Sequence, residues 1–346
     1  MKLSVRRDTL RLRVPLQSAY GKVTERVLLS VSIADRDGAV GYGEAAPLEP
    51  YDGVSVEQVE RALGTYGPVL AGAEGLNGAQ IVDACRAAAD LPAAFAAVDL
   101  ALWDLAGRRR GRPVAALLTD LPAADVAANA TLTALDRAGA AEQATQAALD
   151  GYACVKLKVG VGDDAGRVAA VRAAAGPQMA LRLDANGAWG VEEAVRAIDA
   201  LASAGLELVE EPTHGVKGVR EVRERVTVRV AIDETASEHG ALGAGAADAV
   251  CLKISRCGGI SGLIAAAALV RASGAGVYLA STLDGPLGVA GAVHAAAALA
   301  SRGRLEPSGL ATLAMFEGLE DPLPARAGRI ALPAGAGLGV EPLEPL

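Results

Sequence analysis

Apolar and polar residues alternate with the two-residue period of β-strands through residues 1–45. Three such runs follow one another, LSVRRDTLRLRV, RVLLSVSIAD and AVGYGE, and Asp37 and Gly38 separate the last two. Because Asp-Gly favours the tight turn of a β-hairpin, the pattern predicts an antiparallel meander. From about Val56 to Arg108 the apolar spacing becomes helical, with breaks near glycine and proline. A sheet followed by helices is typical of an α+β module.

From about Val126 onward, short β-like runs alternate with Ala-rich helical segments such as VEEAVRAIDALASAG. The runs are VAANATLT, CVKLKVG, ALRLDAN, ELVEEP, VRVAIDE, AVCLKIS and GVYLAST. Strands that alternate with helices form a parallel sheet, and so many units favour a closed barrel over an open doubly wound sheet. No G-x-G-x-x-G follows the first strand and no Walker A pattern occurs, which disfavours a nucleotide-binding open sheet. The predicted fold class is therefore α/β with a barrel.

Charged residues stand at the ends of five successive β-like runs. They are Lys156 with Lys158, Asp184, Glu210 with Glu211, Asp233 with Glu234, and Lys253. The spacing between successive run ends is close to one βα unit, so a barrel brings all of them to the C-terminal rim, where such barrels keep their active sites. For any single carboxylate a solvated loop charge is the simpler interpretation. A series in register on five strands favours a functional site instead.

Lys156 and Lys158 are two residues apart in an apolar strand, so both side chains point to the same side of the sheet. Burying two ammonium groups side by side is costly unless a partner balances the charge or one group loses its proton. An alternative is the edge of a sheet, where lysines prevent aggregation. The segment by itself leaves both interpretations open.

Three carboxylates that converge from neighbouring strands cannot all stay ionised without a cation. Oxygen-only ligation with room for water and substrate favours Mg²⁺ over Ca²⁺ or Zn²⁺. On opposite sides of such a cation, Lys158 and Lys253 could remove or deliver a proton at a substrate carbon. Lys156 next to Lys158 is expected to lower the pKa of Lys158 and keep it usable as a base. This arrangement suits proton abstraction next to a carboxylate.

The charge balance narrows the possible partners. A net charge of −8 argues against nucleic acid or an anionic membrane surface as the main partner, and is compatible with a small anionic ligand. The N-terminus has no apolar core of a signal peptide and no segment is a clean membrane span, so we expect a cytoplasmic protein. The four cysteines show no C-x-x-C pairing and are interpreted as core thiols.

The ordered motifs resemble those of the enolase superfamily, and within it the muconate lactonizing enzyme subgroup. The matching motifs are KLK (156–158), DAN (184–186), EEP (210–212), DE (233–234), LK (252–253), GYGEAAPLEPYDG (41–53) and AAVDLALWDLAGRRRGRPV (96–114). The resemblance covers nearly the whole chain. It implies an α+β capping domain from residues 1–120, completed by 321–346, over a modified TIM barrel, (β/α)₇β, at 121–320.

The same resemblance implies roles for the residues at the strand ends. Asp184, Glu210 and Asp233 would ligate Mg²⁺, with Lys158 and Lys253 as the acid/base pair and Lys156 beside them. Asn186, Glu211 and Glu234 would support the site. The family often has Gln where this chain has Glu211, so either of the two adjacent glutamates could be the ligand.

Three reactions fit the subgroup: cycloisomerisation of muconate, epimerisation of dipeptides or N-acylamino acids, and dehydration to o-succinylbenzoate in the menaquinone pathway. The segment 304–316 lacks the Asp-x-Asp pair that dipeptide epimerases typically carry. That segment and STLDGPLG (281–288) look more like o-succinylbenzoate synthases, so a Mg²⁺-dependent lyase is the preferred prediction. There Lys158 would remove the α proton, and Lys253 would stay charged on the other face. A barrel without catalysis, kept as a scaffold, is the remote alternative.

The remaining expectations concern contacts with other molecules. The substrate is expected to be a small-molecule carboxylate, and the family commonly forms homo-oligomers. The candidate substrate contacts are Gln17, Ser18 and Tyr20 in a loop of the capping domain, and Ser281 and Asp284 after the last β-like run. For Asp284 a turn residue in Asp-Gly-Pro is an equal alternative, and for the other three an ordinary polar turn is a serious one.

Overall fold

The computed structural model describes residues 1–18 and 20–343, without the side chain of Ser18. The N-terminal part begins with an antiparallel sheet of order β1-β2-β3. Its strands are β1 (Lys2–Ser18), β2 (Gly21–Ala34) and β3 (Val40–Ala45). Between β2 and β3, the amide of Asp35 donates to the carbonyl of Ala39 at 2.8 Å, which closes the turn around Asp37 and Gly38. The predicted meander is confirmed.

Helices follow this sheet along the chain. They are α1 (Glu49–Asp52), α2 (Val56–Ala71), α3 (Gly78–Ala88) and α4 (Pro92–Arg110). Two of them, α2 and α4, pack directly on the sheet. Capping boxes, in which a polar side chain satisfies the first free amides of a helix, begin α2 at Ser55 and α3 at Asn77. Leu29, Val31 and Ile33 of β2 are buried against apolar residues of α2 to α4. The N-terminal module therefore has an apolar core of its own.

Strand β3 lies directly on α4, and only glycine allows this approach. A Cβ atom on Gly43 would lie 2.0 Å from the carbonyl oxygen of Ala97 in α4. We expect Gly43→Ala to destabilise the protein by about 1–3 kcal/mol, as overpacking of a tight interface does. Thermal unfolding measures the effect. Gly64→Ala is the control, because a Cβ at Gly64 in α2 meets no atom within 4 Å, and equal stability of the two variants would contradict the prediction.

The second part is a parallel sheet of order β11-β10-β9-β8-β7-β6-β5. Its strands are β5 (Ala130–Leu132), β6 (Cys154–Lys158), β7 (Ala180–Asp184), β8 (Leu206–Glu210), β9 (Arg229–Ile232), β10 (Ala249–Leu252) and β11 (Gly276–Leu279). The segment 306–309 closes the ring as an eighth strand. On one side the amide of Gly309 donates to Leu279 O at 2.7 Å, and on the other the amide of Ser308 donates to Ala127 O at 2.9 Å.

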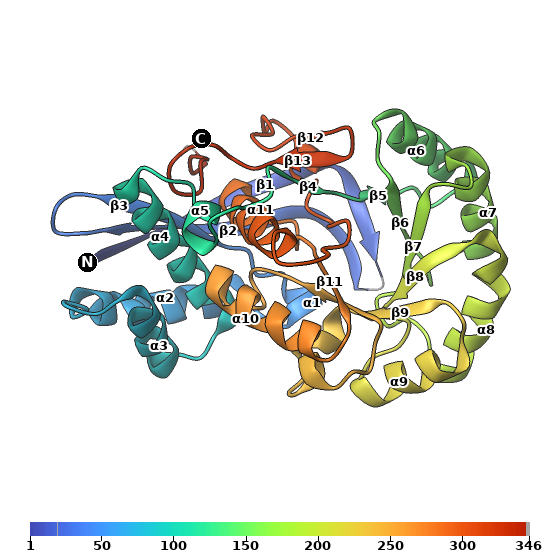
Figure 1. Ribbon diagram of the computed structural model, residues 1–346, viewed down its shortest axis with the longest axis horizontal. Helices are drawn as coiled ribbons and strands as arrows, with labels where there is room; N and C mark the ends of the chain where they lie inside the picture. Colours follow the sequence, from blue (N-terminus) through green and yellow to red (C-terminus); the bar gives the residue numbers. More distant parts are fainter. Residues whose placement is uncertain (19, 344–346) are drawn as a thin grey trace.

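Connecting helices surround the barrel, and α6 to α9 form its outer arc in Figure 1. They are α6 (Arg137–Leu149), α7 (Asp164–Ala175), α8 (Val191–Leu201), α9 (Val216–Arg225), α10 (Gly259–Ala272) and α11 (Pro286–Ala300). Between β9 and β10 only the short 3₁₀ turns η2 (Glu234–Ser237) and η3 (Ala241–Gly243) occur; η1 (Ala202–Ala204) and η4 (Leu313–Met315) are similar turns elsewhere. Seven strand-plus-crossover units and a closing strand make the predicted (β/α)₇β barrel.

The C-terminal tail returns to the N-terminal module. The short strands β12 (Ala325–Arg326) and β13 (Arg329–Ala331) pair with β4 (Asp125–Ala127), next to α5 (Ala115–Leu118). Further on, the amide of Leu338 donates to the buried carboxylate of Asp104 in α4 at 2.7 Å. The tail therefore contacts both β4, which lies inside the predicted barrel range 121–320, and α4 of the N-terminal module. The exact domain boundaries stay a prediction, and residues 344–346 lie outside the described part of the chain.

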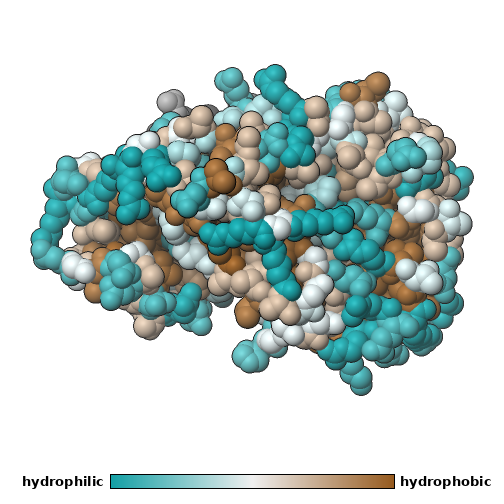
Figure 2. Space-filling view, viewed as in Figure 1, coloured by the Kyte–Doolittle hydropathy of each residue, from teal (hydrophilic) through white to brown (hydrophobic). Residues whose placement is uncertain are grey.

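The surface mixes hydrophobic and hydrophilic residues (Figure 2). On the face in Figure 2, hydrophobic residues are seen mostly as small groups among hydrophilic ones. Among the described residues, none of the helices combines the length and the apolar composition needed to cross a membrane. The oligomeric state stays a prediction.

Candidate active site

The charged residues of the strand ends do meet at one rim of the barrel. Lys158 of β6 is in register with Asp184 of β7, which is in register with Glu210 of β8. Asp233 follows the end of β9, and Lys253 follows the end of β10. In the order of the sheet, β6 and β10 are separated by three strands. The two lysines therefore reach the centre of the barrel mouth from opposite sides.

The lysines of β6 are paired with carboxylates. Lys156 Nζ lies 2.8 Å from Asp184 Oδ2 and 2.7 Å from Glu210 Oε1. Lys158 Nζ donates to Asp184 Oδ2 at 2.6 Å and to Asn186 Oδ1 at 2.7 Å. Because β6 is bonded on both sides, to β5 and to β7, the alternative of a sheet edge is wrong. Ion pairing is how the structure accommodates two adjacent, partly buried ammonium groups.

Burial and pairing act against each other on the pKa values of these groups. Burial lowers the pKa of Lys156, but Asp184 and Glu210 raise it above its ordinary value. Burial raises the pKa of Asp184, yet Lys156 and Lys158 lower it below its usual range. The pKa of Glu210 is raised, mainly by burial and against the effect of Lys156. Lys156 is thus held as a cation that balances two carboxylates.

Lys253 is held from the N-terminal module as well as from the barrel. Its Nζ donates to Asp233 Oδ2 and to the hydroxyl of Tyr51, which follows β3 in the 41–53 motif. Tyr51 Oη in turn donates to Asp233 Oδ1 at 2.8 Å and accepts from Arg256 Nη1 at 2.7 Å. Burial lowers the pKa of Lys253, and Asp233 raises it above its ordinary value. The group is therefore kept protonated.

The two adjacent glutamates point in different directions. Glu211 has a positive φ of 41°, and its carboxylate accepts hydrogen bonds from the amides of Asp233 at 2.8 Å and Thr235 at 3.0 Å. These bonds turn Glu211 away from the barrel mouth and hold the loop that carries Asp233. Glu210 instead accepts from Lys156 and, at 2.8 Å, from the hydroxyl of Tyr278. Glu210 is the one of the pair that faces the cluster.

Asn186 and Glu234 connect the barrel rim to the N-terminal module. Asn186 Nδ2 donates to Glu234 Oε1 at 2.9 Å, and Tyr20 Oη donates to the same oxygen at 3.1 Å. Burial, followed by the charges of Asp233 and Asp184, raises the pKa of Glu234 to about 7. His214 Nε2 lies 3.4 Å from Tyr20 Oη, and His214 Nδ1 lies 3.1 Å from Glu211 Oε1. The tip of the β1–β2 hairpin is in this way tied to the rim.

A pocket opens above the lysines. It is lined by polar and charged residues, namely Asn129, Thr131, Lys156, Lys158, Asn186, Asp233, Lys253, Ser281, Thr282 and Thr312, and by Tyr20, Tyr51, Tyr278 and apolar side chains of both modules, including Leu16, Val23, Leu48, Leu283 and Met315. The rings of Tyr20, between β1 and β2, and Tyr51, in α1, meet edge to face with centroids 5.6 Å apart.

The predicted substrate contacts divide into groups. Tyr20 and Ser281 line the pocket, but Gln17 and Asp284 are not among the described lining residues. Asp284 is buried and accepts from the hydroxyl of Thr282 at 2.9 Å, so it shapes the loop after β11 instead of facing the pocket. Gln17 pairs with Lys22 across a hairpin, not in an open loop. The side chain of Ser18 lies outside the described residues.

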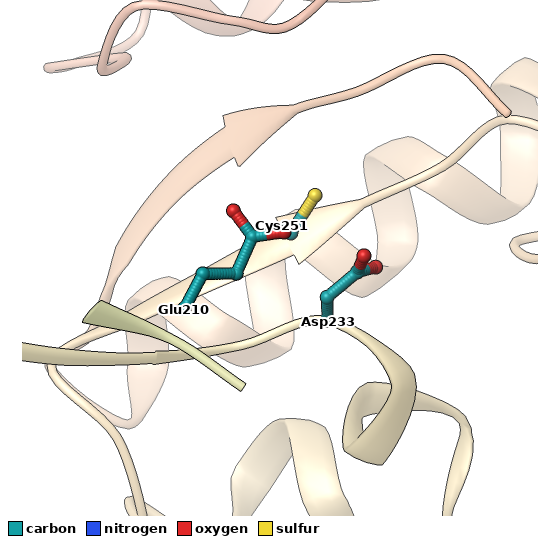
Figure 3. Close-up of side chains that lie close together, drawn as sticks. All are labelled: Glu210, Asp233 and Cys251. Atoms are coloured by element: carbon teal, nitrogen blue, oxygen red, sulfur yellow. The ribbon is translucent and has the colours of Figure 1, made fainter. Parts of the chain in front are cut away.

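A cation site is compatible with the residues at the rim. Donor atoms of Glu210, Asp233 and Cys251 all lie within 4.8 Å of one another, and Figure 3 shows them on three neighbouring strand ends. Asp184 is next to this group, where its Oδ2 is shared by Lys156 and Lys158. One oxygen of Glu234, Oε2, is buried without a hydrogen-bond partner. Converging buried carboxylate oxygens are the donors that a hard divalent cation needs.

Three contributors were missed by the sequence analysis. Tyr51 lies in the quoted 41–53 motif, and Arg256 follows Lys253 by three residues, but neither was assigned to the site. Cys251 was interpreted as a core thiol, although its position two residues before Lys253 puts both side chains on the same face of a strand. Strand alternation could therefore have indicated from the sequence that Cys251 faces the same side as Lys253.

Family models match both modules of this chain. The model described as mandelate racemase / muconate lactonizing enzyme, N-terminal domain, matches residues 1–119. The model described as enolase C-terminal domain-like matches residues 139–345. Together the two models account for most of the chain.

Individual proteins agree with this assignment. The chain is 32% identical over 364 residues to muconate cycloisomerase 1 of Rhodococcus opacus, covering 96% of this chain and 94% of that protein. It is 38% identical over 183 residues to o-succinylbenzoate synthase of Thermobifida fusca, covering 49% of this chain and 56% of that protein. A dipeptide epimerase from Enterococcus faecalis V583, solved with Mg and the dipeptide L-Leu-L-Tyr, superposes with a TM-score of 0.89 at 28% identity and covers 98% of each chain. The chain therefore belongs to the enolase superfamily, in its muconate lactonizing enzyme subgroup.

Proposed function

We propose that this enolase superfamily enzyme removes a proton α to the carboxylate of a small-molecule substrate, and that its overall reaction is the dehydration that forms o-succinylbenzoate. The observation that carries the first part is the placement of Lys158 and Lys253 on opposite sides of one pocket, above buried carboxylates. A carbon between them can lose a proton to one lysine while the other faces the developing negative charge.

Asp184, Glu210 and Asp233 are the proposed ligands of Mg²⁺. Their oxygen donors fit a hard divalent ion. Lys156 and Lys158 are both paired with Asp184, so ammonium groups are at hand to offset negative charge at the rim. When bound, Mg²⁺ supplies positive charge for the substrate carboxylate and for the negative charge that grows as the α proton leaves.

The lysines have different proposed roles. Lys158 Nζ takes the α proton, and Asp184 and Asn186 hold its side chain in position for this. Proton transfer to Lys158 also provides the acid that a departing hydroxyl group on the same face requires. Lys253, protonated beside Asp233 and Tyr51, contributes a fixed positive charge on the other face.

The composition of the pocket supports a substrate without a free ammonium group. Asp233 is the single carboxylate among the described lining residues, and it is already paired with Lys253. An α-ammonium group of a dipeptide would therefore lack an acidic partner, and leaving a buried charge unpaired is costly. The precursor of o-succinylbenzoate and N-acylated amino acids carry no such group. The similarity to a synthase of that product supports the first of these.

A substrate panel tests the proposal. With Mg²⁺ present in D₂O, NMR follows the cyclohexadiene precursor of o-succinylbenzoate, N-acylamino acids, dipeptides and muconate. Rapid loss of water from the precursor is expected. Exchange or epimerisation of another compound without dehydration of the precursor would keep the proton-abstraction chemistry and overturn the assigned reaction, and inertness toward all of them would overturn both.

Epimerisation of an N-acylamino acid is the second candidate. The opposed lysines favour it, because one can remove the α proton and the other can return a proton to the opposite face. The similarity over 98% of both chains to an epimerase agrees with this geometry. In that reaction Lys253 must exchange protons, whereas in the dehydration it stays protonated throughout.

Tyr51→Phe is expected to slow the reaction roughly 10- to 100-fold, since it removes a buried hydrogen bond to a charged group, worth about 1.5–3 kcal/mol. The hydroxyl positions Lys253 and Asp233, so the loss should fall on kcat more than on KM. Steady-state kinetics with the active compound of the panel measures both constants. Tyr152→Phe, away from the described pocket lining, is the matched control. An unchanged kcat in Tyr51→Phe would remove Tyr51 from the positioning of Lys253.

A further inference from the structure

Cys251 carries a buried thiol next to two carboxylates of the candidate active site, Glu210 and Asp233. It precedes Lys253 by two residues on β10, so both side chains point into the barrel, and only 2% of Cys251 is exposed. Within the described part of the chain, its thiol has no hydrogen-bond partner. Figure 3 shows the sulfur beside the carboxylate groups of Glu210 and Asp233, which come from the neighbouring strand ends.

We propose that Glu210, Asp233 and Cys251 form a mixed oxygen and sulfur site that binds thiophilic divalent cations such as Zn²⁺, Cd²⁺ and Co²⁺. The inference rests on the proposed function only in one respect: such an ion would take the place of Mg²⁺ at the two shared carboxylates. It assigns to Cys251 a ligand role that an all-oxygen magnesium centre does not use.

The geometry requires little rearrangement. Zinc binds cysteine sulfur at about 2.3 Å and carboxylate oxygen at about 2.0–2.2 Å, so two ligand atoms of one ion are never more than about 4.5 Å apart. The donor atoms of the three residues already lie within 4.8 Å of one another. Small side-chain movements are enough to bring them around a common ion.

The chemistry of the donors sets the preference. Thiolate sulfur selects borderline and soft cations, whereas Mg²⁺ gains almost nothing from a sulfur ligand. On binding, the S–H bond of Cys251 breaks, a sulfur–metal bond forms, and the proton goes to solvent without any change of oxidation state. A thiolate in place of the third carboxylate is what separates this site from the proposed magnesium site.

The surrounding charges can balance the bound ion. Two carboxylates and one thiolate carry one more negative charge than a divalent cation neutralises. Lys156 Nζ lies 2.7 Å from Glu210 Oε1, and Lys253 Nζ is paired with the carboxylate of Asp233. These two ammonium groups offset the extra negative charge. A buried site with an uncompensated charge would be unfavourable, and this one has its counter-ions built in.

Cadmium titration of the full-length protein, freed of Mg²⁺ by a chelator, tests the proposal. Added CdCl₂ should produce the ultraviolet charge-transfer band of a cadmium–thiolate bond, saturating at one equivalent, in the wild type and in Cys257→Ser. Cys257 is a more exposed thiol outside the three-residue group, which makes it the matched control. In Cys251→Ser the band should be absent, and affinity for Cd²⁺ should fall by more than the roughly 10- to 100-fold that loss of an outer partner of a ligand costs.

Three results of the cadmium titration would overturn the proposal. Absence of the band in the wild type, its survival in Cys251→Ser or its loss in Cys257→Ser would each overturn the proposal. The ¹¹³Cd NMR resonance of the wild type distinguishes one sulfur ligand from none, so the answer does not depend on how well a variant folds. Neither readout uses turnover, and a protein that is inert toward every compound of the substrate panel would still decide the question.

Discussion

Replacing Lys158 with alanine is expected to abolish exchange of the substrate α proton with D₂O. A positioned general base contributes about 10²- to 10⁴-fold to the rate, and Lys158 is the proposed base. Its Nζ is held by Asp184 at 2.6 Å and by Asn186 at 2.7 Å at the wall of the pocket. NMR of the active compound in D₂O with Mg²⁺ measures the exchange. The fold should survive, because Asp184 keeps its second ion pair with Lys156 at 2.8 Å.

Lys217→Ala is the matched control for this experiment. Lys217 lies on α9 and is exposed, so the same change there should leave exchange unchanged. Exchange in Lys158→Ala that stays within about tenfold of the wild type would reject Lys158 as the base. The Mg²⁺-dependent rise in melting temperature should persist in both variants, which separates loss of the base from loss of the cation.

The positions of the strand ends could be predicted because barrel topology fixes them. Each parallel strand ends at the same rim, so charged residues recurring once in every βα unit must come together there. Lys158, Asp184 and Glu210 are in register on adjacent strands as that argument requires. The antiparallel meander of the N-terminal module could be predicted equally well, because strand alternation and an Asp-Gly turn are local signals. Which residues bind metal or substrate stays a prediction.

Contacts between distant segments could not be predicted in the same way. Tyr51 lies in α1, just after β3, and contacts Lys253, which is 202 residues further along the chain. No local pattern around Tyr51 encodes that contact, which depends on how the N-terminal module packs on the barrel. The partners of the two adjacent lysines show the same limit. Lys156 is paired with Asp184 and Glu210, which come from the next two strands, and the segment around Lys156 does not encode either carboxylate.

The choice between Glu210 and Glu211 also depended on the neighbouring strand. Strand alternation sends adjacent residues to opposite sides, but it cannot say which of two glutamates faces the barrel. The amides of Asp233 and Thr235 hold the carboxylate of Glu211, and they do so at a positive φ that a non-glycine residue adopts only when its surroundings favour it. The remaining carboxylate, Glu210, is thereby directed to Lys156 and Tyr278.

Glu210→Gln is expected to remove the stabilisation of the protein by Mg²⁺ and to lower activity by at least about a hundredfold, because a proposed charged ligand becomes neutral without changing shape. For the wild type, Mg²⁺ at a hundredfold excess over its Kd should stabilise the fold by about 2.7 kcal/mol, seen as a rise in Tm. Thermal unfolding with and without MgCl₂ measures this rise. Glu221→Gln, on the exposed side of α9, is the control and should keep it in full. If Glu210→Gln also keeps the full rise, the cation is bound elsewhere and the ligand set proposed for it is wrong.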